Sequence, residues 1–140
     1  MLAGVRERCN AIEECYELML GYAAQGLPGD QGSQSGGQVR EFLRRAVEAL
    51  SGLAAAYSEA VKQAGLQPPE PYQAFLTVLE RDAKDALAAM GLVLAQPSIS
   101  SQLVDNLNAS IHLRALLTDL FLIDEILRPQ PVSANPAATS

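Results

Sequence analysis

The segment LRALLTDLFLIDEIL, residues 113–127, carries leucine or isoleucine at alternating steps of three and four residues. The set is Leu113, Leu116, Leu120, Ile123 and Leu127. Steps of three and four average about 3.5 residues, close to one turn of an α-helix, so these side chains share one side of a helix. A narrow apolar seam of this kind has to be buried against other helices. The segment therefore predicts a protein built from packed helices.

Three other segments of similar length repeat the same spacing. Their apolar positions are Leu2, Val5, Cys9, Ile12, Tyr16, Met19 and Ala23, then Val39, Leu43, Ala46, Leu50, Leu53, Tyr57 and Ala60, then Tyr72, Leu76, Leu79, Ala83, Ala86, Met90 and Val93. Four seams predict four long helices, over residues 2–25, 38–64, 71–96 and 100–128. We expect an all-α, antiparallel up-down-up-down four-helix bundle.

The helix ends are marked by glycine, proline and serine. Gly26 and Gly65 are each followed by a leucine and soon by a proline, which is typical of a helix that stops at a left-handed glycine. Ser100 is the expected N-cap of the last helix, and Pro71 the first residue of the third. Residues 27–37, rich in Gly, Ser and Gln, are predicted to be a flexible tether. The domain is expected to span 1–128, with a disordered, proline-rich tail over 129–140.

Composition excludes several classes of function. A chain of 140 residues with a net charge of -6 is the size of one domain and lacks the basic surface that nucleic-acid binding requires. Arg6 and Arg8 follow the N-terminus too closely for a signal peptide. The longest uncharged run, residues 86–104, is interrupted by Gln, Pro and Ser, so no membrane-spanning helix is expected. These features predict a cytoplasmic protein with neither a nucleic-acid nor a membrane partner.

The residues that could carry chemistry are few. Cys9 belongs to a buried seam, whereas Cys15 lies off it, where an exposed thiol is expected. His112, the single histidine, shares a predicted helix face with Asp105 and Asp119, an arrangement that would suit a general base. Each carboxylate is about 10 Å away along the helix axis, so a solvated polar stripe explains the three residues better.

No cofactor or metal site is indicated. Helical bundles that hold two metal ions use a Glu-x-x-His pair from two helices, but the residue three positions before His112 is Ala109. Zinc would need more Cys and His ligands than the chain contains. Nucleotide-binding and nucleophile motifs are also absent from the sequence. The sequence therefore predicts neither an enzyme nor a bound cofactor.

The last helix is apolar on more sides than one bundle can bury. Besides the seam, Leu103, Leu107, Leu117 and Phe121 occupy a second side, and Leu122 and Ile126 a third. The surplus predicts a homodimer interface, a groove for another protein, or deeper burial within one chain. The candidate interaction surface is the seam itself: Leu113, Leu116, Leu120, Ile123 and Leu127.

The favoured function is therefore protein–protein interaction. We expect a non-enzymatic adaptor, assembly factor or small chaperone that forms a homodimer through its last helix. The alternative is a bundle that binds a small molecule or a metal between its helices. In that case Gly21, Gly52 and Gly91 would provide room, whereas the simpler explanation of these glycines is close packing of helices.

Overall fold

A computed structural model describes residues 2–128 of the chain, and within them the fold is all α-helical. The helices are α1 (Leu2–Ala24), α2 (Gln34–Leu50), α3 (Leu53–Ala64), α4 (Pro69–Leu94), α5 (Ser101–Ala109) and α6 (Ile111–Leu127). The expected tail, 129–140, lies outside the described residues.

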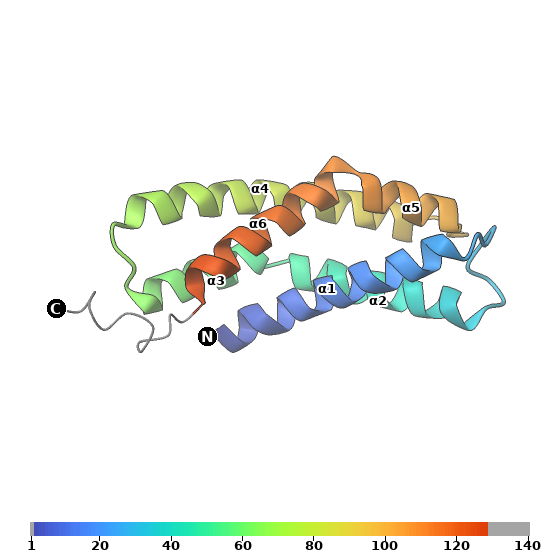
Figure 1. Ribbon diagram of the computed structural model, residues 1–140, viewed down its shortest axis with the longest axis horizontal. Coiled ribbons are helices and arrows are strands. Elements are labelled where there is room, and N and C mark those ends of the chain that lie inside the picture. Colours follow the sequence, from blue (N-terminus) through green and yellow to red (C-terminus); the bar gives the residue numbers. More distant parts are fainter. Residues whose placement is uncertain (1, 129–140) are drawn as a thin grey trace, which may run out of the picture.

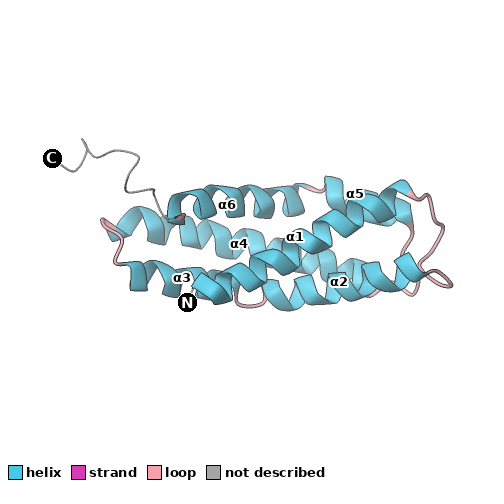
Figure 2. Ribbon diagram, turned by 60° about the horizontal axis from the view of Figure 1, so that its bottom comes forward, coloured by secondary structure: helices cyan, strands magenta, loops and turns pink. Residues whose placement is uncertain are grey.

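The helices form an elongated bundle with one apolar core (Figure 1). α1 packs against α2 and α5, and α4 packs against α3 and α6. α3 continues the course of α2 along the molecule, and α6 continues that of α5 (Figures 1 and 2). α4 and α6 lie side by side in both views and run in opposite directions.

The prediction of four uninterrupted helices is wrong at two points. The expected helix 38–64 is divided into α2 and α3 by Gly52, whose φ of 134° lies in a region that L side chains rarely adopt. Arg8 of α1 donates a hydrogen bond to the carbonyl oxygen of Ala49 over 2.8 Å. The last carbonyl oxygens of a helix have no hydrogen-bond partner within the helix. A guanidinium that binds them favours the end of the helix at that point.

The second break separates α5 from α6 within the expected helix 100–128. Ser110 ends α5 with an extended backbone, ψ 146°, and its side chain then accepts a hydrogen bond from the amide of Leu113 over 3.3 Å. The residue is thus the C-cap of one helix and the N-cap of the next. The break separates the face of Asp105 from that of His112.

Most of the predicted end signals are confirmed, with small shifts in the starts. Gly26 and Gly65 have φ values of 66° and 62°, and the Ser100 hydroxyl accepts from the amide of Leu103 over 3.0 Å. α2 begins at Gln34 instead of residue 38, because Ser33 caps it. α4 begins at Pro69, two residues before the expected Pro71.

The segment before α2 is held in place, so the predicted flexible tether is wrong. Asp30 is 9% exposed, and its carboxylate accepts from the amide of Ile99 over 2.6 Å and from Arg40 Nε over 2.8 Å. The Arg40 guanidinium also donates to the carbonyl oxygens of Leu94 and Gln96. This ion pair connects the first loop to the end of α4.

A second set of bonds closes the same end of the bundle. The Ser101 hydroxyl donates to the carbonyl of Tyr22 over 2.6 Å and accepts from the amide of Leu27 over 2.8 Å. The Tyr22 hydroxyl donates to the carbonyl of Ile99 over 2.7 Å. Because these partners are more than 70 positions apart in the chain, the bonds fix α1 against α5.

Candidate functional site

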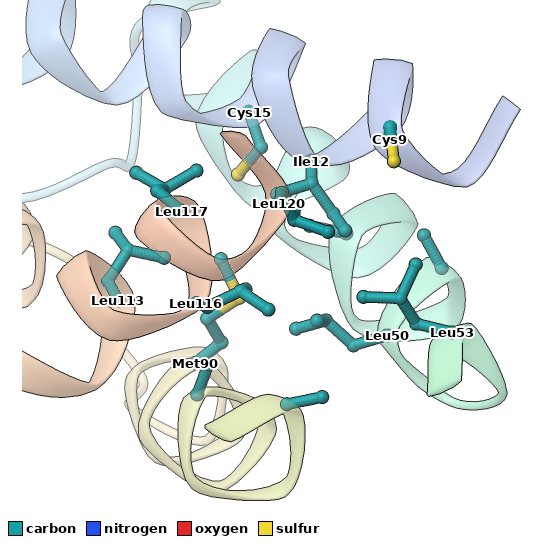
Figure 3. Close-up of a cluster of buried hydrophobic side chains, with 14 of the residues drawn as sticks. Cys9, Ile12, Cys15, Leu50, Leu53, Met90, Leu113, Leu116, Leu117 and Leu120 are labelled. Atoms are coloured by element: carbon teal, nitrogen blue, oxygen red, sulfur yellow. The ribbon is translucent and has the colours of Figure 1, made fainter. Parts of the chain in front are cut away.

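The predicted interaction surface lies in the core. Leu113, Leu116, Leu120 and Ile123 are at most 2% exposed, and Leu127 is half-buried. Figure 3 places Leu116 and Leu120 in the space between Ile12 of α1 and Met90 of α4. The seam closes the core of a single chain, and this placement corrects the expectation that it faces a second subunit.

Other apolar side chains are exposed, and within residues 4–128 four of the seven large ones are on α6. Ile111 is 75% exposed, Phe121 65%, and Leu122 and Ile126 52% each; on the other helices they are Leu20, Val78 and Leu92. A helix turns by about 100° per residue, so Ile111, Ala115, Leu122 and Ile126 lie within about 60° of one another on the solvent side of α6. We call these four residues the α6 stripe. It is about 22 Å long.

Two exposed apolar residues of α4 extend this surface. α4 faces α6 at Asp82, whose carboxyl interacts with that of Asp119. Val78 and Leu92 lie within about 80° of Asp82 around α4, on the side away from its buried seam. Because the two helices are antiparallel, Val78 lies toward the Ile126 end of α6 and Leu92 toward the Ile111 end. Val78, Leu92 and the α6 stripe together are the α4–α6 face.

A pair of carboxyl groups lies within this face. Asp119 is 8% exposed, and its Oδ2 atom is buried without a hydrogen-bond partner. Burial, and after it the interaction with Asp82, raises the pKa of Asp119 to about 7. The carboxyl of Asp119 therefore holds its proton below neutral pH.

The surroundings of the pair supply no compensating positive charge from the adjacent turns. The residues one turn before and after Asp119 are all apolar. Among the residues one turn from Asp82, Asp85 is the charged one, and its charge is negative. His112 is exposed two turns before Asp119, about 10 Å along the axis. The expected face of Asp105, His112 and Asp119 is divided, because the helix breaks at Ser110: Asp105 lies on α5, whereas His112 and Asp119 lie on α6.

A second polar cluster connects α1, α3 and α6. Cys9 Sγ lies 3.0 Å from the Tyr57 hydroxyl, and this hydroxyl donates to Asp124 Oδ1. A hollow of about 290 Å³ adjoins the cluster, lined by Val5, Arg6, Cys9, Asn10, Glu13, Asp124, Leu127 and Arg128. Burial raises the pKa of Cys9 to about 11, so its thiol is protonated near neutral pH and is a poor nucleophile.

Cys15 is a correction to the sequence prediction. Its side chain is 0% exposed instead of open to solvent, and Figure 3 shows it pointing toward Leu117 and Leu120 of α6. Burial raises the pKa of its thiol to about 12. Cys15 is therefore a small apolar residue of the core.

A further hollow is a candidate place for the small-molecule alternative. It has a volume of about 370 Å³ and opens between α1, α5 and α6, lined by Tyr16, Leu20, Asp105, Asn108, Ala109, Arg114, Leu117, Thr118 and Phe121. Gly21 and Gly91 do not line it, and close packing of helices does not explain them, because a Cβ added at either one meets nothing within 4 Å. Between residues 2 and 128, no group of three or more His, Cys, Asp or Glu side chains is placed to hold a metal.

Comparisons with protein-family models, curated proteins and solved structures give no match. Of the helices in the described part of the chain, none has the length and hydropathy needed to cross a membrane.

Proposed function

We propose that this protein acts in the cytoplasm without catalysing a reaction, by binding protein, and that its α4–α6 face forms a homodimer. The observation that carries the proposal is the exposed α6 stripe beside Val78 and Leu92. An adaptor, an assembly factor or a small chaperone would use such a surface. We further propose that α2 with α3, and α5 with α6, are two broken helices of an antiparallel up-down-up-down four-helix bundle.

A second copy of the chain is the partner that the charges on α6 favour. Arg114 and Glu125 are both exposed and lie about 20° apart on one flank of the stripe. A two-fold axis near the middle of α6 would place Ile111 opposite Ile126 of the second copy, and Arg114 within about one helical turn of its Glu125. A surface that complements itself in this way is what a two-fold interface requires.

The apolar area supports a weak and reversible dimer. Val78, Leu92, Ile111, Leu122 and Ile126 are each 42% to 75% exposed, so burying the remainder of each contributes roughly 1 kcal/mol. Two copies gain about 10 kcal/mol in total, and association itself costs about 4 to 15 kcal/mol. Within one chain, Glu125 forms an exposed ion pair with Arg128 over 3.5 Å. An exposed ion pair is weak, so it opposes a new pairing of Glu125 with Arg114 of the second copy only slightly.

A matched pair of variants tests the proposal. Leu122 and Leu20 are 52% and 49% exposed, but only Leu122 belongs to the α4–α6 face. Sedimentation velocity at protein concentrations up to several hundred micromolar should show a dimer for the parent and for Leu20→Glu, and a folded monomer for Leu122→Glu. A parent protein that stays monomeric, or equal dissociation of both variants, would overturn the proposal.

A further inference from the structure

The hollow between α1, α5 and α6 is built from one face of each helix. On each of the three helices its lining residues are three, four or seven positions apart, which is the spacing of side chains that share a face. Its volume is about 370 Å³. Sites that bind small molecules have volumes of about 300 to 1,000 Å³. The hollow is therefore large enough for a small ligand.

The break at Ser110 gives the hollow its two opposite charges. Asp105 and Arg114 are nine positions apart, about two and a half turns, so in one continuous helix they would lie on opposite sides. Ser110 interrupts the helix with an extended backbone, ψ 146°, and both residues line the same hollow. The break therefore brings a carboxylate of α5 and a guanidinium of α6 to one site.

Both charges are available to a ligand. Asp105 and Arg114 are exposed, and within residues 4–128 neither forms an ion pair. Asn108 lines the hollow one turn after Asp105, and its Oδ1 atom is buried without a hydrogen-bond partner. A turn of this amide toward a donor in the hollow would satisfy the acceptor. The α5 side thus offers acceptors for a cationic donor, and Arg114 offers donors for an anion.

Apolar side chains provide the remaining wall. Leu117 is 8% exposed, whereas Leu20 of α1 and Phe121 of α6 are 49% and 65% exposed. A ligand with an apolar group would remove part of the Leu20 and Phe121 surface from water. The aromatic rings of Tyr16 and Phe121 favour a large, flat group at this place.

We propose that this hollow binds a free amino acid with a large apolar side chain. The ammonium group pairs with Asp105, the carboxylate pairs with Arg114, and the side chain covers Leu20 and Phe121. Both ligand charges are needed, because a cation alone is repelled by Arg114 and an anion alone by Asp105. The inference goes beyond the proposed homodimer, which uses the α4–α6 face.

An NMR titration of the ¹⁵N-labelled chain with L-phenylalanine provides the test. We expect saturable shifts of the Asn108, Leu117 and Phe121 amides, with a dissociation constant of roughly 1 mM or below. Two analogues dissect the recognition: 2-phenylethylamine lacks the carboxylate, and 3-phenylpropionate lacks the ammonium group. Each should bind at least tenfold more weakly than L-phenylalanine.

Matched variants locate the site. Asp105→Asn and Arg114→Gln should each raise the dissociation constant at least fivefold. Asp85→Asn and Arg81→Gln, which remove exposed charges of the same sign on α4, should leave it unchanged. Circular dichroism verifies that all four variants fold.

A second matched pair tests the apolar wall. Phe121→Ala should weaken binding at least threefold, whereas Leu92→Ala, at a residue that is 67% exposed on α4, should not.

Three results would overturn the inference: shifts that do not saturate, an analogue that binds as tightly as L-phenylalanine, or control variants that weaken binding as much as Asp105→Asn and Arg114→Gln do. None of them bears on the homodimer, which sedimentation of Leu122→Glu tests separately.

Discussion

Replacing Asp119 by asparagine should stabilise the folded chain, and more so at higher pH. The pKa of this carboxyl rises from an ordinary value of 3.8 to about 7 in the folded state, through burial first and Asp82 second. A raised pKa means that the folded state binds the proton more tightly than the unfolded state does. The stabilisation is complete below about pH 4 and is lost as the pH rises through about 7.

The magnitude follows from the same shift. Each pKa unit corresponds to about 1.4 kcal/mol, so between pH 5 and pH 8 the parent loses roughly 2 to 3 kcal/mol at this site. Asparagine does not ionise, and its side-chain amide can donate to the Asp82 carboxylate. The difference in free energy of unfolding between Asp119→Asn and the parent should therefore grow by that amount over this interval.

Urea unfolding followed by circular dichroism measures the difference. The protein should be at low micromolar concentration, so that dimer dissociation does not contribute. Asp85→Asn is the matched control, because Asp85 is exposed one turn from Asp82, and it should shift stability by less than about 0.5 kcal/mol at either pH. An equal difference between Asp119→Asn and the parent at pH 5 and pH 8 would contradict a raised pKa at Asp119.

Three further predictions concern the fold. Asp30→Asn should lower the free energy of unfolding by about 2 kcal/mol at pH 7 and by almost nothing at pH 2. Arg40 and the Ile99 amide lower the pKa of Asp30 from 3.8 to about 2, and the stability that this shift provides is lost as the pH falls through that range. Urea unfolding at both pH values measures the difference. Gly52→Ala should cost about 1 to 3 kcal/mol because of its φ of 134°, whereas Gly91→Ala, with open space at its Cβ, should gain up to about 1 kcal/mol; equal effects in thermal melts would contradict this. Leu120→Asp should abolish the helical circular dichroism signal at 25 °C, because Leu120 is 1% exposed, while Leu122→Asp should leave it unchanged.

The seams predicted the core well because burial depends on which side of a helix a residue occupies. Of the last seam, Leu113, Leu116, Leu120 and Ile123 are all buried, and the all-helical class is confirmed. The same regularity led to the wrong interaction surface. A seam with ideal spacing is the side that the chain itself buries, and the surplus side, with Leu122 and Ile126, is the one left for a partner.

The breaks and the closed end could not be read from local sequence. Gly52 resembles any mid-helix glycine until Arg8, more than 40 positions away, is seen to bind the carbonyl end of α2. Asp30 lies in a segment whose composition is typical of a flexible loop, yet Arg40 and Ile99 hold it in place. The one available signal for the carboxyl pair was Asp119 itself, an acidic residue at the edge of a seam.

An antiparallel contact of α6 with its own copy can be tested by a symmetric cross-link. Thr118 is exposed and lies next to the proposed axis, so Thr118→Cys should form an intermolecular disulfide with its own mate under mild oxidation at pH 6. The two native thiols are buried and should not interfere. Glu17→Cys, exposed on α1, is the control. We expect a covalent dimer of Thr118→Cys at a concentration where Glu17→Cys stays monomeric on a non-reducing gel. Equal cross-linking of the two variants, or none in either, would contradict an antiparallel α6 contact.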